Sequence, residues 1–210
     1  GPQGTLYGRS AIGGTINLTP TRPGFDNEGS TLLELGNYSA LHATITQNIR
    51  ASDNLAFRLA ADYIRNDGFM ETGADAKNDV GVRLSTLYAP SEQLSIYLWA
   101  QHAEKHGYAA NLVNKGTNPA TGEYCENCFL NSDPWDDTRR GAVAGPFGEP
   151  KREKADYETS TIGGQIDYDF GAATLTYIPS YLYLDTVPTY WLSAIQAINT
   201  AHYNQLTQEL

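Results

Sequence analysis

The sequence is short of basic residues, of cysteine and of long apolar runs. Among its 210 residues, 14 Lys and Arg stand against 24 Asp and Glu, which gives a net charge of −10. A binder of nucleic acid needs a basic face, so we expect no nucleic-acid partner. No run of about 18 apolar residues occurs, which excludes a membrane-spanning helix. A nucleophile elbow, a phosphate-binding loop and an HExxH motif are also missing, so we expect neither an enzyme nor a bound cofactor.

The ends of the sequence lack what the ends of a complete secreted protein would show. The chain opens on Gly1 without a signal peptide, that is, without a charged segment followed by an apolar one and a cleavage site. It closes on residues 205–210, which have the pattern of the middle of a strand. We therefore expect the sequence to be a fragment of a longer protein.

Most of the chain alternates between apolar and polar residues with period two. In residues 55–63, apolar side chains alternate with the more polar Arg58 and Asp62, as in a strand with one apolar and one polar face. Such segments run for about 10 to 14 residues, longer than the five or six typical of soluble sheets and long enough to cross a bilayer at a tilt. The 14 Tyr and 20 Gly suit the aromatic girdles and curved strands of an antiparallel transmembrane β-barrel.

The polar side chains of these segments are predicted to face the barrel interior. A charge on the lipid side costs roughly 2–4 kcal/mol at the membrane midplane, whereas the interior is polar. The residues assigned to the interior face are Arg58, Asp62, Arg83, Gln101, Gln165, Asp167 and Asp169.

The connections between segments fall into two classes, short turns near residues 53, 90 and 171 and long loops near residues 68, 122 and 195. The two classes alternate strictly along the chain. Outer-membrane barrels have this pattern, with short periplasmic turns and long extracellular loops. The longest loop is predicted near 106–155, and a second long loop, with room for a helical turn, over 187–203 before a last strand near Asn204.

The opening glycine-rich stretch reads GPQGTLYGR at residues 1–9 and IGGTIN at residues 12–17. It resembles the last part of the plug domain of TonB-dependent receptors. The segments RNDGF at 65–69, DVGVRL at 79–84 and APS at 89–91 resemble the opening hairpins of that family's barrel, and QLTQEL at 205–210 is similar to a strand start common there. The resemblance covers most of the chain.

The resemblance implies an all-β protein of the outer membrane, with a 22-stranded antiparallel barrel that surrounds a globular plug. Residues 1–25 would end the plug and 26–210 would form the first seven or eight strands, in contact with membrane lipid. Ligand would enter from outside. Energy would come from the inner membrane through TonB, by way of a plug segment that this sequence does not contain.

The resemblance also implies active import of a scarce nutrient, with a ferric siderophore as the first expectation because it is the most frequent substrate class. Alternatives within transport are a carbohydrate, cobalamin or another metal chelate. A passive porin-like or adhesin barrel is an alternative from another class, although passive porins lack a plug motif. A soluble sugar-binding β-protein would have shorter strands and no alternation of short and long connections.

Several residues are candidates for sites, each with a plainer alternative. The plug signature is expected to be structural, since glycine permits tight turns and close packing; it comprises Gly4, Tyr7, Gly8, Arg9, Gly13 and Gly14. Candidate ligand contacts offer stacking rings or a charge, although packing between loops or a membrane-interface girdle would use the same types; they are Arg9, Tyr108, Trp135 and Trp191.

The two cysteines, Cys125 and Cys128, lie in the longest loop, where oxidising conditions favour a disulfide between them. A zinc site with His102 and His106 is disfavoured, because residues four apart on a strand lie about 13 Å apart. A thioredoxin-like reading lacks the βαβ context. Asp133, Asp136 and Asp137 could bind Ca²⁺ on a surface loop, but they lack the spacing of an EF-hand, so we expect no metal site.

Overall fold

The computed structural model describes residues 19–108, 121, 123, 154–192 and 195–210. These residues form one antiparallel sheet of nine strands. The strands are β1 (Glu28–Gly36), β2 (Ala40–Arg50), β3 (Leu55–Asn66), β4 (Lys77–Tyr88), β5 (Leu94–Gly107), β6 (Ala155–Asp169), β7 (Thr174–Leu192), β8 (Ile195–Ile198) and β9 (Ala201–Glu209). Within the described part of the chain, no helix is long and apolar enough to cross a membrane.

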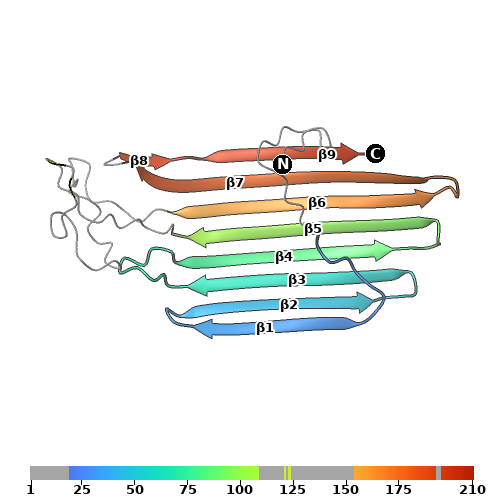
Figure 1. Cartoon of the computed structure of the whole chain (residues 1–210), viewed down its shortest axis with the longest axis horizontal. Coiled ribbons are helices and arrows are strands. Elements are labelled where there is room, and N and C mark those ends of the chain that lie inside the picture. The colour runs from blue at the N-terminus through green and yellow to red at the C-terminus, as the bar shows by residue number, and fades with distance from the viewer. Residues whose placement is uncertain (1–18, 109–120, 122, 124–153, 193–194) are drawn as a thin grey trace.

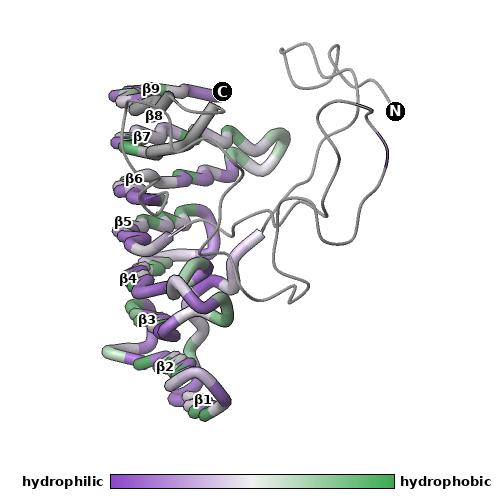
Figure 2. The backbone as a smooth tube through the Cα atoms, turned by 90° about the vertical axis from the view of Figure 1, so that its left-hand side faces the viewer, coloured by the Kyte–Doolittle hydropathy of each residue, from purple (hydrophilic) through white to green (hydrophobic). Residues whose placement is uncertain are grey.

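The strands pair in chain order from β1 to β7, so that the chain runs up and down through the sheet (Figure 1). The last turn departs from this order: the end of β7 pairs with the short β8, and the preceding part of β7 pairs with β9. Seen from one end, the strands stack in a single layer that bends at β1 (Figure 2). The prediction of an all-β antiparallel fold is therefore confirmed.

The two faces of the layer differ in polarity, because residues directly opposite each other on antiparallel strands point to the same side. One row joins Asn48, Arg58 and Ser85 on β2, β3 and β4. We call this side the concave face. The other, outward face carries large apolar side chains that stay exposed, such as Leu98 at 50% and Ile162 at 60%. A continuous exposed apolar face is what lipid contact requires.

The apolar band on the outward face does not follow the rows of paired residues. One row joins Ile45, Ala61 and Val82 and then reaches His102 on β5. Barrel strands tilt by about 35–45° from the barrel axis, so a row perpendicular to them climbs through the membrane. The polar outward residues that follow Ala100 on β5 therefore lie beyond the apolar band, toward the long-loop end.

The connections segregate by end of the sheet, but not as strictly as the sequence predicts. Short turns over 51–54, 89–93 and 170–173 lie at one end; the connection over 67–76, the end of β5 and the start of β6 lie at the other, which we call the long-loop end (Figure 1). The exception is the three-residue turn between β1 and β2, which lies at the long-loop end. Tyr38 and Ser39 have φ of 58° and 55°, and the Ala40 N–H donates to the Asn37 carbonyl at 3.1 Å. Two successive positive φ values are typical of type I′ turns, whose twist suits a hairpin.

The prediction of a loop over residues 187–203 is wrong. β7 continues to Leu192, and Thr189 to Leu192 pair back with β8. β9 then starts at Ala201, three residues before the predicted start. The segment is rich in aromatic and β-branched residues, which favour extended backbone once a partner strand is present.

The ladder between β6 and β7 is interrupted at Pro179, but without a bulge. Gly163 pairs with Ser180 and Ile166 pairs with Tyr177, while the two residues between them on each strand do not pair with each other. The register is the same on both sides of the gap, so no residue is inserted. Proline lacks the N–H that a ladder hydrogen bond needs, which accounts for the gap.

Candidate functional site on the concave face

The chain crosses the concave face before it enters β1, and we call residues 19–27 the leading segment. Three hydrogen bonds between Asn48 and the leading segment attach it to β2, and we call them the clasp. The Gly24 N–H donates to Asn48 Oδ1 at 2.9 Å, and Asn48 Nδ2 donates to the carbonyls of Gly24, at 2.6 Å, and of Asp26. Asn48 is 1% exposed. Because both its N–H groups and its oxygen are engaged, the amide is satisfied and oriented by the leading segment alone.

A second attachment lies further across the sheet. Arg22 Nη2 donates to Gln165 Oε1 at 2.6 Å, and its guanidinium carbon lies 4.8 Å from the centre of the Tyr97 ring. Tyr97 and Gln165 are register partners on β5 and β6. The Gln165 amide nitrogen donates to both Asp167 oxygens, at 3.0 and 2.9 Å, which turns Oε1 toward Arg22.

The rings extend this contact along β5 into a column. The ring centres of Tyr97 and Trp99 lie 5.1 Å apart, and the Arg83 guanidinium lies 5.6 Å from the Trp99 ring. Arg83 also donates to Gln101 Oε1 at 2.9 Å and to the Tyr97 hydroxyl at 3.2 Å. We call Arg22, Tyr97, Trp99 and Arg83 the ring column. Two aromatic rings stacked between two guanidinium groups join the leading segment to the wall.

The ring column depends on a glycine of the neighbouring strand. A Cβ placed on Gly163 would come within about 2.4 Å of a Trp99 ring atom. The indole therefore lies over the backbone of β6, in space that any side chain at position 163 would occupy. Among the described residues, Arg83 Nε has no hydrogen-bond partner although it is buried. An acceptor from the interior of the barrel could meet it there.

A charged bridge ties the first three strands together nearer the long-loop end. His42 on β2 places Nδ1 2.8 Å from Glu34 Oε2 and Nε2 2.8 Å from Asp62 Oδ2. A protonated imidazole can donate to both carboxylates at once. Since every polar atom of the ring has a partner, this bridge is suited to fastening β1 and β3 to β2 rather than to holding a ligand.

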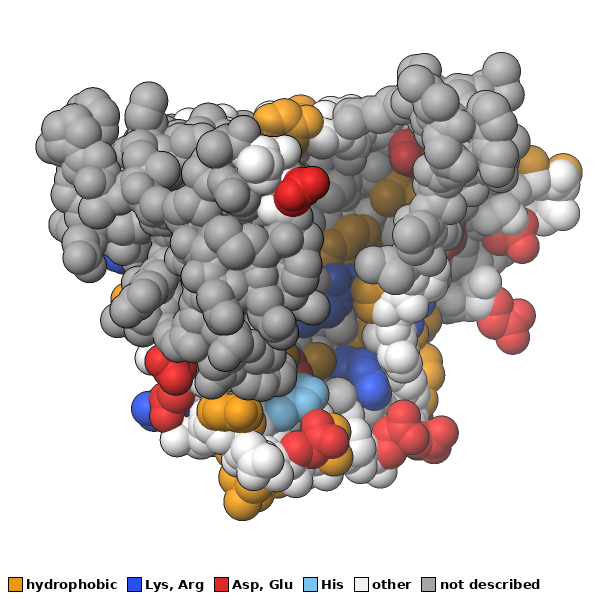
Figure 3. Space-filling model, turned by 60° about the vertical axis from the view of Figure 1, so that its left-hand side comes forward, with side chains coloured by type: hydrophobic (Ala, Val, Ile, Leu, Met, Phe, Trp, Pro, Cys, Tyr) orange, Lys and Arg blue, Asp and Glu red, His pale blue; other side chains and the backbone are white. Residues whose placement is uncertain are grey.

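Between the bridge and the ring column lies a shallow depression of about 260 Å³. Its floor is made of small residues on neighbouring strands, Ala60, Gly81 and Ala103, with Thr44 and Thr46 beside them. Seen toward the long-loop end, the molecule is hollowed on this side, and basic side chains lie in the hollow (Figure 3). The depression is smaller than a usual ligand site of roughly 300–1,000 Å³, which suits a packing surface.

The predicted interior residues all lie on the concave face, as the register of β3 to β7 requires; they are Arg58, Asp62, Arg83, Gln101, Gln165, Asp167 and Asp169. Within the described ranges, no group of His, Cys, Asp and Glu side chains could hold a metal ion. His102 and His106 both contact Glu104, at 3.1 and 3.3 Å, on the outward face.

Most predicted site residues lie outside the described part of the chain, namely the plug signature, Trp135, Cys125 and Cys128. The backbone of Trp191 lies in β7, and nothing is described of its side chain. Tyr108 follows β5, bridges to Lys154, and its N–H donates to the Ala76 carbonyl at 3.0 Å. It is therefore at the long-loop end, away from the ring column.

The clasp and the ring column are not among the predicted sites. One signal for the column is present in the sequence: β5 has Tyr97 and Trp99 on the side that also carries Gln101, so both of its faces are apolar. Neither Asn48 nor Arg22 stands out in this way, because their roles depend on contact between segments far apart in the chain.

No family model matches the chain. Over 119 residues it is 31% identical to the ferrioxamine receptor of Yersinia enterocolitica, a match that covers 56% of this chain and 16% of that receptor. The ferric-catecholate import receptor Fiu of E. coli K12 has a similar fold, with TM-scores of 0.69 for its closed form and 0.64 for its open form. These matches cover 99% of this chain and 30% and 33% of the Fiu chains, at 19% identity.

The fold defines the class: an antiparallel up-and-down sheet with a polar concave face and an apolar outward face is part of a transmembrane β-barrel. The sequence match and the fold match together support the resemblance to TonB-dependent receptors of the outer membrane. The proteins that it matches are receptors for transport and not enzymes. The chain spans less than a third of the sequence relative and about a third of the structural one.

Proposed function

We propose that this receptor imports a ferric siderophore across the outer membrane, with energy supplied through TonB. The observation that carries the proposal is the 31% identity over 119 residues to a ferrioxamine receptor. The fold match to a ferric-catecholate import receptor agrees with it in substrate class, since both names denote iron chelates. The inner-membrane partner would act through a plug segment outside this sequence, and membrane lipid would cover the outward face.

We further propose that residues 1–25 end the plug and 26–210 begin the barrel. The leading segment supports a boundary near this point, because its contacts with the wall continue to Asn27, whose Oδ1 accepts from the Arg50 N–H at 2.7 Å, and β1 starts at Glu28. Each neutral hydrogen bond of the clasp contributes about 0.5–1.5 kcal/mol, and an arginine over a ring about 0.5–2 kcal/mol. A plug pulled from the inner membrane would then rearrange ahead of Arg22, while its last residues stay attached to the wall.

The ligand contacts proposed are Arg9, Tyr108, Trp135 and Trp191, from the plug end and the long loops. Tyr108 supports this choice by its place at the long-loop end of the sheet, where a ligand arrives from outside. Arg9 would offer a cation to an anionic chelate. A disulfide between Cys125 and Cys128 would close a small ring in the longest loop.

The test is uptake by cells in which the full-length protein is the sole receptor of its kind. Radiolabelled ferrioxamine, a ferric catecholate, cobalamin and an oligosaccharide would be offered in turn, with and without TonB. We expect one of the ferric chelates to accumulate and its uptake to stop when TonB is deleted. Accumulation of cobalamin or of the sugar instead would show that the substrate is not a ferric siderophore. Uptake without TonB would support the passive or adhesin alternative.

A further inference from the structure

The charged bridge at His42 needs one proton more than a neutral histidine and two ionised carboxylates supply. The two ring nitrogens lie 2.8 Å from Glu34 Oε2 and 2.8 Å from Asp62 Oδ2. A neutral imidazole has one N–H and one bare nitrogen, and an ionised carboxylate can only accept. With a neutral ring, one of the two contacts would bring a nitrogen lone pair against an oxygen lone pair. The three groups must therefore share an additional proton.

The other charges on the concave face lie too far from His42 to take the place of this proton. Within the described residues, the remaining concave charges of β1 and β3 are Glu28 and Arg58, which contact each other at 3.8 Å toward the short-turn end. In the row of His42, Asp79 on β4 and Lys105 on β5 are two and three strands away. At a strand spacing of about 4.8 Å, these two opposite charges lie about 10 and 14 Å from the ring, beyond the screening length of physiological salt.

Loss of the shared proton would leave one N–H for two carboxylates. The Asp62 side chain is 46% exposed and that of Glu34 is 60% exposed, so the charge of Asp62 is the less screened of the two. Asp62 also belongs to β3, which is paired on both sides, with β2 and β4. The N–H would therefore stay with Asp62, and the contact between His42 and Glu34 would open.

The long-loop half of β1 has little else to hold it to the sheet. In the described sheet β1 pairs with β2 alone, and its large apolar residues are exposed, Leu33 at 64% and Leu35 at 78%. Beyond Ser30, the contact of Glu34 with His42 is the one side-chain hydrogen bond that joins β1 to β2 among the residues that the structure describes.

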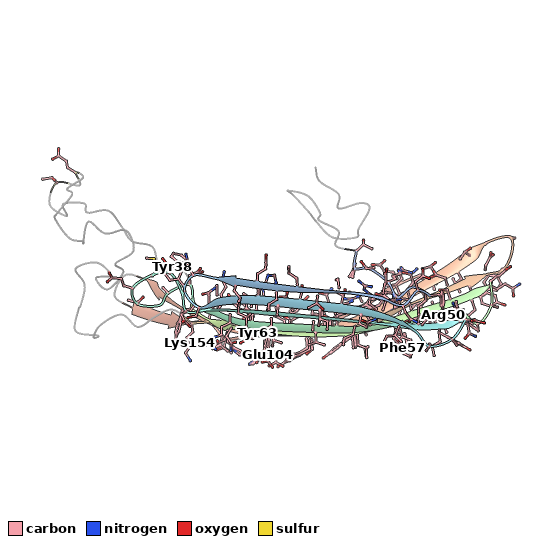
Figure 4. All side chains as sticks on the ribbon, turned by 90° about the horizontal axis from the view of Figure 1, so that it is seen from below. Tyr38, Arg50, Phe57, Tyr63, Glu104 and Lys154 are labelled. Atoms are coloured by element: carbon pink, nitrogen blue, oxygen red, sulfur yellow. The ribbon has the colours of Figure 1, made fainter. Side chains whose placement is uncertain are left out.

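The turn that closes this end adds to the dependence on the bridge. Tyr38 and Ser39 have φ of 58° and 55°, a left-handed conformation that glycine adopts at lower cost than residues with a Cβ. Figure 4 shows Tyr38 at the same end of the sheet as Lys154 and at the opposite end from Arg50. The hairpin of β1 and β2 thus ends in a turn that is costly to form, close to the contact that needs the proton.

We propose that Glu34, His42 and Asp62 form a proton-dependent fastener, which holds the long-loop end of β1 to β2 while the shared proton is bound and releases it when the proton is lost. Because the folded sheet binds this proton, the stability that the fastener contributes is present at low pH and is lost as the pH rises. The fastener does not depend on the imported ligand, so its failure would leave the proposed import untouched.

The test is hydrogen exchange at residues 33–35 of β1 in the full-length receptor in liposomes. Exchange would be measured at about pH 5.5 and about pH 9, on either side of the ordinary titration of histidine near pH 6.5, and corrected for the intrinsic effect of pH on exchange. We expect the protection of these amides to be about threefold lower at the higher pH, the size that a partly exposed ion pair allows. The amides of residues 83–85 on β4, away from the bridge, should show no such change.

Three variants assign the effect to the fastener. His42→Gln removes the titrating ring, so the protection of β1 should no longer depend on pH. Glu34→Gln lets a neutral ring donate to Asp62 and accept from the amide at position 34, so β1 should stay protected at both pH values. His102→Gln is the matched control, because His102 also contacts a carboxylate, that of Glu104 at 3.1 Å, but on the outward face of β5. It should keep the wild-type change.

Equal protection of β1 at the two pH values in the wild type would overturn the proposal. A threefold change that persists in His42→Gln or in Glu34→Gln would do the same, because the titrating group would then lie elsewhere. Loss of the change in His102→Gln would assign the effect to the outward face and would also overturn the fastener.

Discussion

The two faces of the sheet use similar side chains in opposite ways. Tyr97 on the concave face is 5% exposed, with Arg22 over its ring. Tyr181 on the outward face is 43% exposed, and its hydroxyl donates to Asn204 at 2.9 Å. The concave face is held by polar contacts among its own residues and with the leading segment, whereas the outward face leaves apolar side chains uncovered. The sheet thus separates the polar interior from the lipid, and its stability depends on its contacts with both.

The largest expected effect comes from a charge on the outward face. Leu98→Arg should destabilise the full-length receptor by roughly 2–4 kcal/mol, because the guanidinium would have to enter the lipid. Thr161→Arg on the concave face is the matched control and should cost less than about 1 kcal/mol, since the interior is polar. Urea unfolding in liposomes measures both. Equal losses would contradict the assignment of the faces.

Loss of the clasp should come next. Asn48→Ala removes three hydrogen bonds and leaves two carbonyls of the leading segment without a partner, at a cost of about 2–3 kcal/mol. Hydrogen exchange at the Gly24 amide should become at least tenfold faster. Asn204→Ala, which removes an outward asparagine on β9, should leave hydrogen exchange at Gly24 unchanged. If Gly24 exchanges as slowly in Asn48→Ala as in the wild type, the clasp does not hold the segment.

The neighbouring glycines of β6 offer a finer comparison of the faces. A methyl group at Gly163 would meet the Trp99 ring at about 2.4 Å, whereas one at Gly164 would meet the end of the Leu98 side chain at about 2.9 Å. The indole is held between Tyr97 and Arg83, but the leucine can turn into lipid. We expect Gly163→Ala to cost about 1–3 kcal/mol and Gly164→Ala clearly less, measured by unfolding. A reversed order would mean that the ring column is not rigid.

The smallest effect is expected at an exposed ion pair near a short turn. Arg50 and Asp53 contact each other with 46% and 95% of their side chains exposed. Such pairs contribute between nothing and about 1 kcal/mol. Arg50→Gln should therefore leave the unfolding midpoint almost unchanged, and added salt should remove what difference remains. A large loss would show that the short-turn end has interactions beyond the pair.

The sequence predicts the central strands well because their alternation is clear. The connection expected near residue 68 lies between β3, which ends at Asn66, and β4, which begins at Lys77. The turn between β1 and β2 escapes prediction, because Tyr38 and Ser39 adopt a left-handed backbone without the glycine that usually signals it. The hairpin of β7 and β8 is not predicted either, because its extended backbone depends on strand pairing and not on a regular alternation of apolar and polar residues.

The candidate site is harder to predict than the fold. Period two places Gln101 and Gln165 on the concave face, but it cannot say that Tyr97 is covered by an arginine from a distant segment. The same holds for Asn48, which is one of several polar residues on its face and is distinguished only by what crosses over it. The alternation of residues along one segment cannot predict contacts with segments far away in the chain.

The most direct test of the difference between the faces is the accessibility of two adjacent residues of β6. Thr161 lies on the concave face and Ile162 on the outward face. Each would be replaced by a spin-labelled cysteine in the full-length receptor in liposomes, with Cys125 and Cys128 changed to serine. We predict that oxygen dissolved in the lipid relaxes the label at 162 strongly and the label at 161 weakly. Equal relaxation at both positions, or stronger relaxation at 161, would contradict the account.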